Sequence, residues 1–401
     1  MKRKVTTPAK SAAPASAACY QQVFSVPFSY PVYFTRDVFN PKHSLLASVF
    51  GPREGGRPHR VIVCLDEGVV RANPKLPARI MAYFGKQAAL DLLAPPEIII
   101  GGEQAKNGWT GVQHVMTLLG HHHLCRHSYV VAIGGGSMLD MVGFAAALVH
   151  RGVRLIRLPT TVLAQNDAGV GVKNGMDEHG MKNFVGTFAP PHAVINDFDF
   201  LATLDDRNWR GGIAEAFKVA IIRDAKFFEF LDKNAAKLRR RDVDAMEQLV
   251  QRCAILHLEH IRGSGDPFEQ GTARPLDFGH WSAHKLETIS KFELGHGQAV
   301  SIGIALDAYY AAEKKLITMA ERDRIVQAMQ RAGLPVWSEF LVARPRNGRL
   351  AVLAGLDEFR EHLGGRLTVT LPNGLGNRVE VHAMDERIIL RGIRWLARKK
   401  A

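Results

Sequence analysis

Cysteine is scarce in this chain, and its four cysteines are scattered. Cys19, Cys64, Cys125 and Cys253 show no C-x-x-C spacing. This pattern excludes a disulfide framework and favours a reducing compartment. We therefore expect a cytoplasmic protein.

Long apolar runs are also missing. No stretch of about 18 apolar residues occurs, so the sequence predicts no membrane-spanning helix and no membrane partner. Residues 1–22 are basic and rich in Ala, Ser and Pro, and they lack the apolar core of a signal peptide. We predict a disordered leader there. A transit peptide is the alternative, although Arg is rare in this stretch.

Zinc-finger and RNP motifs are absent, although the chain carries a net charge of +13. Basic residues cluster at Lys2–Lys4, in "KLRRRD" and in "RGIRWLARKK" near the C-terminus. Such a charge attracts phosphates. A phosphorylated metabolite explains it as well as nucleic acid does, and solvated basic faces account for the terminal clusters. We expect no nucleic-acid partner.

Strand and helix patterns alternate between residues 60 and 200. The stretches "RVIVCLDEG", "PPEIIIGGE", "SYVVAIGGG", "VRLIRLPTT" and "HAVINDFDFL" are short, continuous apolar runs, typical of parallel strands covered on both faces. After residue 206 the apolar residues follow the helical period, and only "RLTVTLPNGLGNRVEV" resembles a hairpin. We predict an α/β Rossmann-like domain over residues 23–205 and a mostly α-helical domain over residues 206–401. A cleft between them is the expected ligand site.

A glycine turn, Gly134–Ser137, follows one strand and precedes a helix. Glycines there let a phosphate approach the backbone and the positive helix N-terminus. The turn lacks the G-x-G-x-x-G spacing, and a plain tight turn is the alternative. Polar residues that lie at or just beyond the carboxyl ends of strands support a nucleotide site: Asp66, Glu103, Lys106, Asp140, Thr160 and Thr161.

Three separated residues suggest a metal site. Glu215 lies in an apolar helical stretch, and His280 and His296 lie far downstream. Two imidazoles and a carboxylate suit zinc and leave a position open for substrate. Histidines that are simply hydrogen-bonded are the alternative, as is a plain ion pair between Glu215 and Lys218. The cluster "HHHLCRH" has no carboxylate, and we interpret it as an exposed loop with adventitious metal binding as an alternative.

The chain resembles the sugar phosphate cyclases, the superfamily of 3-dehydroquinate synthase. The resemblance runs from about Val61 to Val381. It is carried by "GGGSMLD", "RGVRLIRLPTTVLAQNDAGVGVK", "GMKNFVGTF", "FLATL", "GIAEAFK", "DFGH" and "HGQAVSIG". It implies NAD, one Zn²⁺ or Co²⁺ ion, a phosphorylated sugar substrate and a homodimer. A transient ketone acidifies the neighbouring hydrogen so that phosphate can leave, and the returned hydride leaves no net redox change.

The resemblance also implies roles for individual residues. The metal ligands it implies are Glu215, His280 and His296. It places NAD against Asp66, Glu103, Lys106, Gly135, Gly136, Ser137, Asp140, Thr160, Thr161, Lys182 and Thr203. It places Asp167, Lys173, Asn183, Lys218 and His284 around the substrate, as catalytic or binding residues, with Arg151 reaching the phosphate from the neighbouring subunit.

The chain departs from 3-dehydroquinate synthases where they hold the substrate carboxylate. Counting back from "DFGH" places Glu259 and Ala273 at the positions of their lysine and arginine, with Arg274 one residue away. Asp277 replaces an Asn, and His362 stands where a lysine pair is usual. A carboxylate facing Glu259 would be repelled, so we expect a substrate without one. "DFGH" and "EFREHLGG" resemble the C7-cyclitol synthases, which cyclise sedoheptulose 7-phosphate, and an uncharacterised 3-dehydroquinate synthase-like branch.

Four other functions remain open. 3-Dehydroquinate synthase is the nearest, and a metal-dependent alcohol or glycerol dehydrogenase predicts net NADH formation instead. A nucleic-acid-binding module predicts steeply salt-dependent DNA binding. A catalytically inactive scaffold is the fourth.

Overall fold

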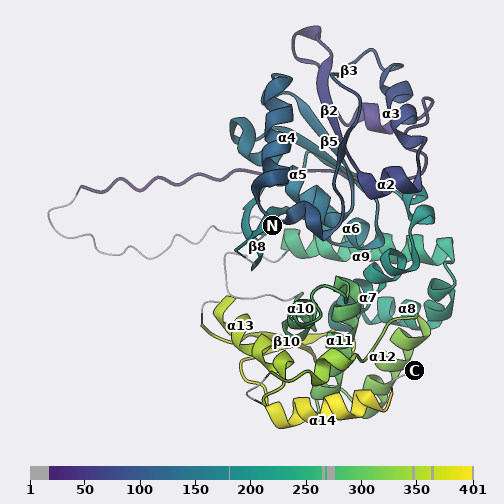
Figure 1. Cartoon of the computed structure of the whole chain (residues 1–401), viewed down its shortest axis with the longest axis vertical. Helices are drawn as coiled ribbons and strands as arrows, with labels where there is room; N and C mark the ends of the chain where they lie inside the picture. Colours follow the sequence, from purple (N-terminus) through teal and green to yellow (C-terminus); the bar gives the residue numbers. More distant parts are fainter. Residues whose placement is uncertain are drawn as a thin grey trace, which may run out of the picture.

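The computed structural model describes residues 18–179, 181–263, 267–268, 276–345, 348–362 and 365–399, with only the backbone described at Glu54 and His362. Figure 1 shows a sheet-containing part above a mostly helical part. The predicted boundary at residue 206 coincides with the start of the first long helix of the lower part, which Asp205 caps. The division into domains, and the leader at residues 1–22, remain predictions. Residues 1–17 of that leader lie outside the described residues.

A parallel sheet organises the upper part. Its strand order is β1-β9-β6-β5-β2-β3, with β4 also paired to β2, and every pairing is parallel. The strands are β1 (Val32–Thr35), β2 (His59–Asp66), β3 (Leu90–Leu92), β4 (Glu97–Ile99), β5 (Tyr129–Gly134), β6 (Arg154–Pro159) and β9 (Ala193–Asp197). The expected Rossmann-like α/β fold is confirmed, although β1 and β3 were not predicted.

Both faces of the sheet are buried, which explains its continuous apolar strands. In β2, Val61, Val63 and Leu65 pack into one core, whereas Ile62 and Cys64 pack into another. Successive strand residues point to opposite faces, so each face needs its own helical cover. The helices of this part are α1 (Leu45–Ser48), α2 (Glu67–Ala72), α3 (Leu76–Phe84), α4 (Trp109–His121), α5 (Gly136–Leu148) and α6 (Val162–Asn166). Helix α3 covers the first face, and α4 and α5 cover the second.

A hairpin that the sequence analysis did not predict follows α6. Strands β7 (Lys173–Glu178) and β8 (Met181–Phe188) pair antiparallel, outside the parallel sheet. Gly175 and Gly186 face each other so closely that a Cβ on either would lie 2.5–2.7 Å from the other strand's backbone. The hairpin therefore depends on glycine at this crossing.

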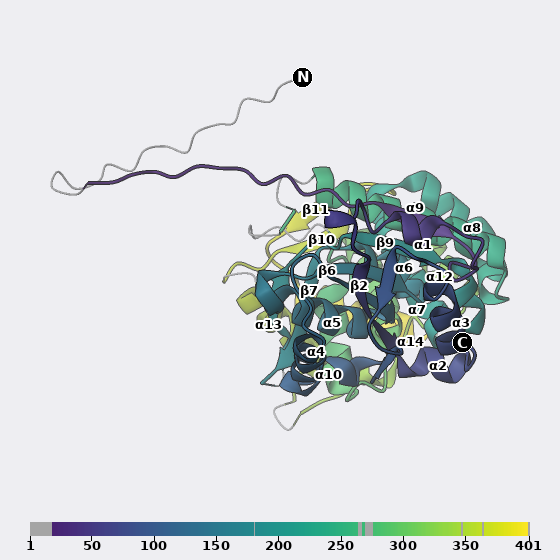
Figure 2. The same cartoon turned by 90° about the horizontal axis from the view of Figure 1, so that it is seen from above.

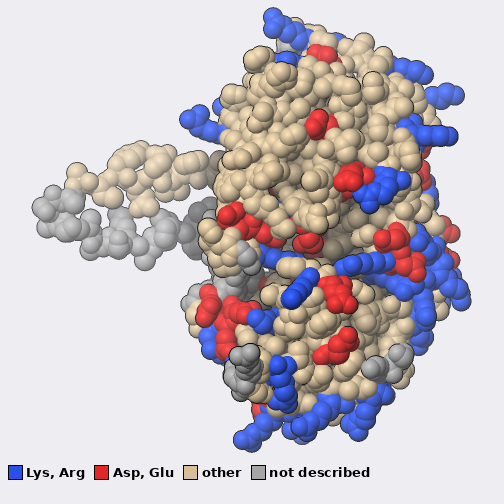
Figure 3. Space-filling model, viewed as in Figure 1, with Lys and Arg blue, Asp and Glu red and all other residues tan. Residues whose placement is uncertain are grey.

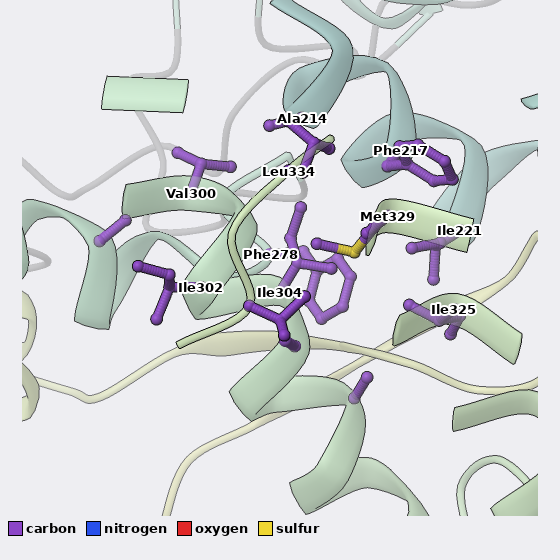
Figure 4. Close-up of a cluster of buried hydrophobic side chains, with 14 of the residues drawn as sticks. Ala214, Phe217, Ile221, Phe278, Val300, Ile302, Ile304, Ile325, Met329 and Leu334 are labelled. Atoms are coloured by element: carbon purple, nitrogen blue, oxygen red, sulfur yellow. The ribbon is translucent and has the colours of Figure 1, made fainter. Parts of the chain in front are cut away.

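Helices build the lower part, as expected. They are α7 (Asp206–Arg223), α8 (Ala225–Arg239), α9 (Val243–Gly263), α10 (His280–Ile289), α11 (His296–Glu313), α12 (Met319–Arg331), α13 (Ala354–His362) and α14 (Glu386–Ala397). The predicted late hairpin is β10 (Val369–Pro372) with β11 (Arg378–Val381). Figure 4 shows Phe278 within the apolar core beside Ile304 and Met329. This fully buried ring anchors the segment that leads into α10.

Two views show how the parts are arranged. Figure 2 looks down on the sheet, with the helices of the lower part beneath it. Figure 3 shows a hollow between the two parts, with charged side chains along its edges. Among the described helices, none has the length and hydropathy that crossing a bilayer requires.

Candidate active site

Three side chains from three helices converge in the lower part. Glu215 lies in the middle of α7, and His280 and His296 are the first residues of α10 and α11. One ligand atom from each lies within 4.8 Å of the others. His280 Nε2 is 3.6 Å and His296 Nε2 is 3.3 Å from Glu215 Oε1. The structure thus brings together the three residues that the sequence proposed as metal ligands.

Glycine contacts bring these three helices together. A Cβ on Gly297 of α11 would lie 2.2 Å from the Gly211 carbonyl oxygen of α7, and one on Gly303 would lie 2.1 Å from the Gly279 carbonyl oxygen. Gly279 has φ +81°, a conformation that favours glycine. The backbones can approach this closely only because glycine has no side chain.

Asp307 of α11 holds the turn before α10. Its carboxylate accepts hydrogen bonds from the Gly279 N–H (3.1 Å) and from Trp281 Nε1 (2.8 Å). Burial raises the pKa of Asp307 to about 7, against these two bonds. Asp307 therefore links α11 to Gly279 and Trp281, the residues directly before and after His280.

The donors suit a divalent cation. Glu215 is fully buried, and neither carboxylate oxygen has a hydrogen bond of ordinary geometry among the described residues, although Lys218 contacts Oε2. His280 Nδ1 is 3.1 Å from the Phe278 carbonyl, and His296 Nδ1 is 3.2 Å from Glu287 Oε2. Each Nδ1 thus has an acceptor, so each Nε2 can present its lone pair toward Glu215. Two imidazoles and one carboxylate, so oriented, fit Zn²⁺ or Co²⁺.

The electrostatics also favour a cation. Burial lowers the pKa of His280 to about 3, so this imidazole is neutral at pH 7. Burial opposes protonation of His296 as well, but contacts with Glu215 and Glu287 outweigh it and raise its pKa to about 10. Lys218 and the histidines overcome the burial of Glu215 and hold its pKa at about 2. The ion pair between Glu215 and Lys218, considered from sequence as an alternative, thus coexists with the ligand geometry.

Glu287 is a functional candidate that sequence reasoning missed. It is buried on α10, where it accepts from Lys182 Nζ at 2.8 Å and faces His296. Together with His284 and His296 it forms a second group whose ligand atoms lie within 4.8 Å of one another. His284 is exposed one turn after His280, with its ring centroid 6.2 Å from that of His296. Glu287 lies two turns along α10 from His280, a spacing that was available in the sequence.

A second missed residue is His257 of α9. Its Nδ1 lies 2.8 Å from Asp167 Oδ1, at the end of α6. Burial by itself would raise the pKa of Asp167, but the charges of His257 and Lys218 outweigh this effect and keep the pKa well below its usual range. His257 shares a helix face with the buried residues Cys253 and His260, which is the signal that could have identified it.

The proposed nucleotide residues gather at the carboxyl edge of the sheet. Asp66 accepts from Gly68 N at 2.7 Å and from Gly135 N at 3.4 Å. A Cβ on Gly134 would lie 2.8 Å from the Asp66 Cβ. Ser137 Oγ donates to Glu103 at 2.8 Å, beside the N-terminus of α5. Gly135 caps α5 and Gly136 begins it.

Further residues complete this edge. Lys106 Nζ lies 2.8 Å from Asp140 and 2.5 Å from Asn183 Oδ1. Thr161 caps α6 by accepting from Ala164 N, and the buried Thr160 Oγ1 has no hydrogen-bond partner among the described residues. An unpartnered buried hydroxyl at a strand end suits a ligand contact. The edge thus offers glycine backbone, two helix N-termini and one unsatisfied hydroxyl to a dinucleotide.

Lys182 of β8 connects the two halves of the site. Its Nζ lies 3.2 Å from Glu103 on the nucleotide side and 2.8 Å from Glu287 on the metal side. These carboxylates overcome the burial of Lys182 and raise its pKa. The unpredicted hairpin therefore positions a cation between the glycine turn and the histidines.

Known proteins resemble this chain along most of its length. The family model for the N-terminal region of 3-dehydroquinate synthase matches residues 97–211, and the model for its C-terminal region matches residues 212–349. The chain belongs to the 3-dehydroquinate synthase family. The resemblance found in the sequence is thereby confirmed, and so is the expectation of an enzyme, because the relatives are sugar phosphate cyclases.

The relatives in this family have different activities. The chain is 34% identical to 2-epi-valiolone synthase of Actinosynnema mirum over 89% of each chain. It is 35% identical to 3-dehydroquinate synthase of Aliivibrio fischeri over 90% of this chain and 94% of the relative. The structure matches 2-epi-5-epi-valiolone synthase of Streptomyces hygroscopicus subsp. jinggangensis, solved with NAD⁺ and Zn²⁺. That TM-score is 0.83, with 30% identity, over 95% of this chain and 100% of that one.

The other residues implied by the family resemblance range from exposed to half-buried. Thr203 is exposed, and its hydroxyl donates to the Phe200 carbonyl. Lys173 is exposed at the start of β7, and Asp277 is half-buried before α10. Arg151 is exposed with φ +63° in a single chain, so its proposed reach into a neighbour stays a prediction. The His362 side chain, Ala273 and Arg274 lie outside the described residues.

The structure places Glu259 and His257 on different sides of α9. Glu259 is exposed on α9, where it contributes to the charge surroundings of Arg223. Residues two apart on a helix point to different sides, so it is His257 that faces Asp167. Whether Glu259 or another residue of α9 occupies the position of the family's lysine stays a prediction.

Proposed function

We propose that this chain is an NAD- and metal-dependent sugar phosphate cyclase. It converts a ketose phosphate, for which sedoheptulose 7-phosphate is our choice, to a carbocycle with loss of phosphate and no net redox change. One observation carries the proposal. His280 and His296 direct Nε2 toward Glu215 while each Nδ1 has its own acceptor, beside a glycine turn that suits a dinucleotide.

Two groups bind from outside the chain. Glu215, His280 and His296 would hold Zn²⁺ or Co²⁺, a Lewis acid and template for the substrate hydroxyls. The glycine turn, with Asp66, Ser137 and Thr160 nearby, would hold NAD, which accepts and returns a hydride. Lys182 lies between the two positions and lowers the repulsion between Glu103 and Glu287.

The chain's own residues bind and orient the substrate. Lys173 and His284 would pair with the phosphate, together with Asn183 and with Arg151 from a second subunit. Asp167, kept ionised by its neighbours, accepts a hydrogen bond from a substrate hydroxyl. Lys218 donates to another hydroxyl from beside Glu215. His284 is the exposed imidazole available to move a proton.

The surroundings of Asp167 support this substrate class. Helix α9 presents His257 to this carboxylate, so the imidazole is already engaged at 2.8 Å. A substrate carboxylate placed beside the ionised Asp167 would be repelled. A hydroxyl or carbonyl group suits this position better, which supports a ketose phosphate that has no carboxylate. The contact between His257 and Asp167 thus supports the same substrate choice independently of Glu259.

Incubation of the purified chain with NAD, Zn²⁺ or Co²⁺ and sedoheptulose 7-phosphate tests the proposal. We expect stoichiometric release of inorganic phosphate, a product whose mass and NMR spectrum show a carbocycle, and no accumulation of NADH. The carboxylated substrate of 3-dehydroquinate synthase serves as the matched comparison.

Two outcomes identify the alternatives. Turnover of the carboxylated substrate alone means that the chain is a 3-dehydroquinate synthase, the activity of its Aliivibrio relative. Net NADH formation from alcohols, without phosphate release, means a dehydrogenase. Either result refutes the proposed substrate.

A further inference from the structure

An extended N-terminal arm, residues 18–31, leaves the body of the molecule. Figures 1 and 2 show it projecting away from the sheet in both views before the chain enters β1. Five large apolar side chains along it are 59–88% exposed: Tyr20, Val23, Phe24, Val26 and Phe28. Scattered apolar residues are normal on a surface, but a contiguous row of them indicates an interaction site.

The arm has the pattern of a half-buried strand. Every even position from 24 to 34 is apolar, and the odd positions from 25 to 31 hold Ser25, Pro27, Ser29 and Pro31. From residue 30 onward, the side chains on this face contact other residues of the same chain. Tyr30 Oη donates to the Val170 carbonyl at 2.8 Å, and Phe34 stacks on Phe198 with ring centroids 6.1 Å apart. The same face is exposed at Phe24 and Val26.

The two prolines decide how the arm can pair. Backbone N–H groups of successive strand residues point to opposite edges, and Pro27 and Pro31 remove two donors from the same edge. The other edge, at residues 24, 26, 28 and 30, keeps all its donors. The arm therefore suits the outermost position of a sheet, added to an open strand edge.

Strand β8 provides such an edge. Within the described strands it pairs with β7 alone, and Met181, Phe184 and Phe188 are 44–52% exposed on it. Phe188 stacks on Phe268 at 5.2 Å, and Phe268 meets Phe28 edge-to-face at 5.7 Å. An aromatic row thus runs from the base of the arm to β8.

We propose that residues 20–28 of one chain lie along β8 of a second copy, forming a dimer with exchanged arms. The lengths match, since residues 20–28 span about 30 Å when extended and the eight residues of β8 about 26 Å. Residues 18–31 contain no charged side chain, which disfavours a nucleic acid or an anionic membrane as the partner. Each copy supplies both an arm and an aromatic strand, as a two-fold interface requires.

Sedimentation equilibrium of the full chain tests the dimer. We expect the parent to be a dimer, and Phe24→Ser/Val26→Ser/Phe28→Ser to raise its dissociation constant at least about 100-fold. Val26→Ser and Val23→Ser form a matched pair, with the same substitution on opposite faces of the arm. Only Val26→Ser should weaken association. Thermal unfolding of each variant shows that the body remains folded.

A monomeric parent, or a triple variant that associates as tightly as the parent, would overturn the proposal. Equal effects of Val23→Ser and Val26→Ser would also contradict it, because association would then not depend on the apolar face. The proposal does not depend on the proposed activity, since the readout is association alone.

Disulfide trapping tests β8 as the receiving strand. In a Cys19→Ser/Cys125→Ser background, which removes the exposed cysteines, chains carrying Phe24→Cys are mixed with chains carrying Met181→Cys, Phe184→Cys or Phe188→Cys in turn. We expect a disulfide between the two kinds of chain for at least one pair under mild oxidation. Val23→Cys is the control that should form less. Absence of mixed disulfides in all three pairs refutes β8 as the partner.

Discussion

The two halves of the site are built in different ways. The nucleotide edge forms where parallel strands end, so its residues lie within a few positions of predictable turns: Asp66 at the end of β2, Gly135 after β5, Thr160 after β6. The metal half joins residues 65 and 81 positions after Glu215, on separate helices. Backbone features dominate the first half and individual side chains the second. The second half should therefore be far more sensitive to single substitutions.

The largest effect is expected at Glu215. Glu215→Ala removes the carboxylate that both Nε2 atoms face, so bound metal should be lost and turnover should fall below about one thousandth of the parent. Metal content by mass spectrometry and phosphate release measure the two effects. Glu259→Gln, at an exposed position on α9, is the control with unchanged values. A metal-free but active Glu215→Ala protein would contradict the ligand assignment.

The close glycine contact between α10 and α11 should also be far more sensitive to substitution than a glycine outside the metal half. In Gly303→Ala the new Cβ lies 2.1 Å from the Gly279 carbonyl oxygen, so α10 and α11 must separate. We expect a loss of about 3 kcal/mol in the free energy of unfolding and weaker metal binding. Gly120→Ala, in α4 with open space around it, should be neutral or slightly stabilising. Equal denaturation midpoints for the two variants would show that the crossing tolerates a methyl group.

His257 tests whether a single side chain outside the metal ligands matters. His257→Leu removes the partner of Asp167, and kcat/KM should fall about 10- to 100-fold, chiefly through KM. His257→Asn can place an amide N–H near the Nδ1 position and should restore much of the loss. A purely structural role predicts instead that both variants lose stability together with activity. Steady-state kinetics and thermal unfolding separate these outcomes.

Measured over a single pH unit, the smallest effect concerns Asp307. Its folded pKa of about 7 exceeds the ordinary value of 3.8, so the folded chain binds more protons than the unfolded chain between these limits. Its contribution to stability is complete below about pH 4 and is lost as the pH rises toward 7, by up to about 1.4 kcal/mol per pH unit. Asp307→Asn should remove this part of the slope. Denaturant unfolding from pH 4 to 7 measures the difference, and parallel curves would exclude it.

Local patterns predicted much of the molecule. Continuous apolar runs indicated strands that are covered on both faces, and glycines between a strand and a helix indicated a turn. Both signals could be recognised because they depend only on residues that are neighbours in the sequence. Strands β1 and β3 were missed because four and three residues give too little periodicity. Hairpin β7–β8 was missed because β7 is mostly polar and β8 mixes apolar and polar residues without strict alternation.

The sequence by itself determined the α/β and helical architecture and the identity of Glu215, His280 and His296 as residues in need of partners. Tertiary structure alone decided that His257 rather than Glu259 meets Asp167, that Glu287 supports His296, and that Lys182 joins the two halves. The physical reason is that periodicity defines which face of one helix is buried. The crossing of helices, which depends on close glycine contacts, decides which buried faces meet.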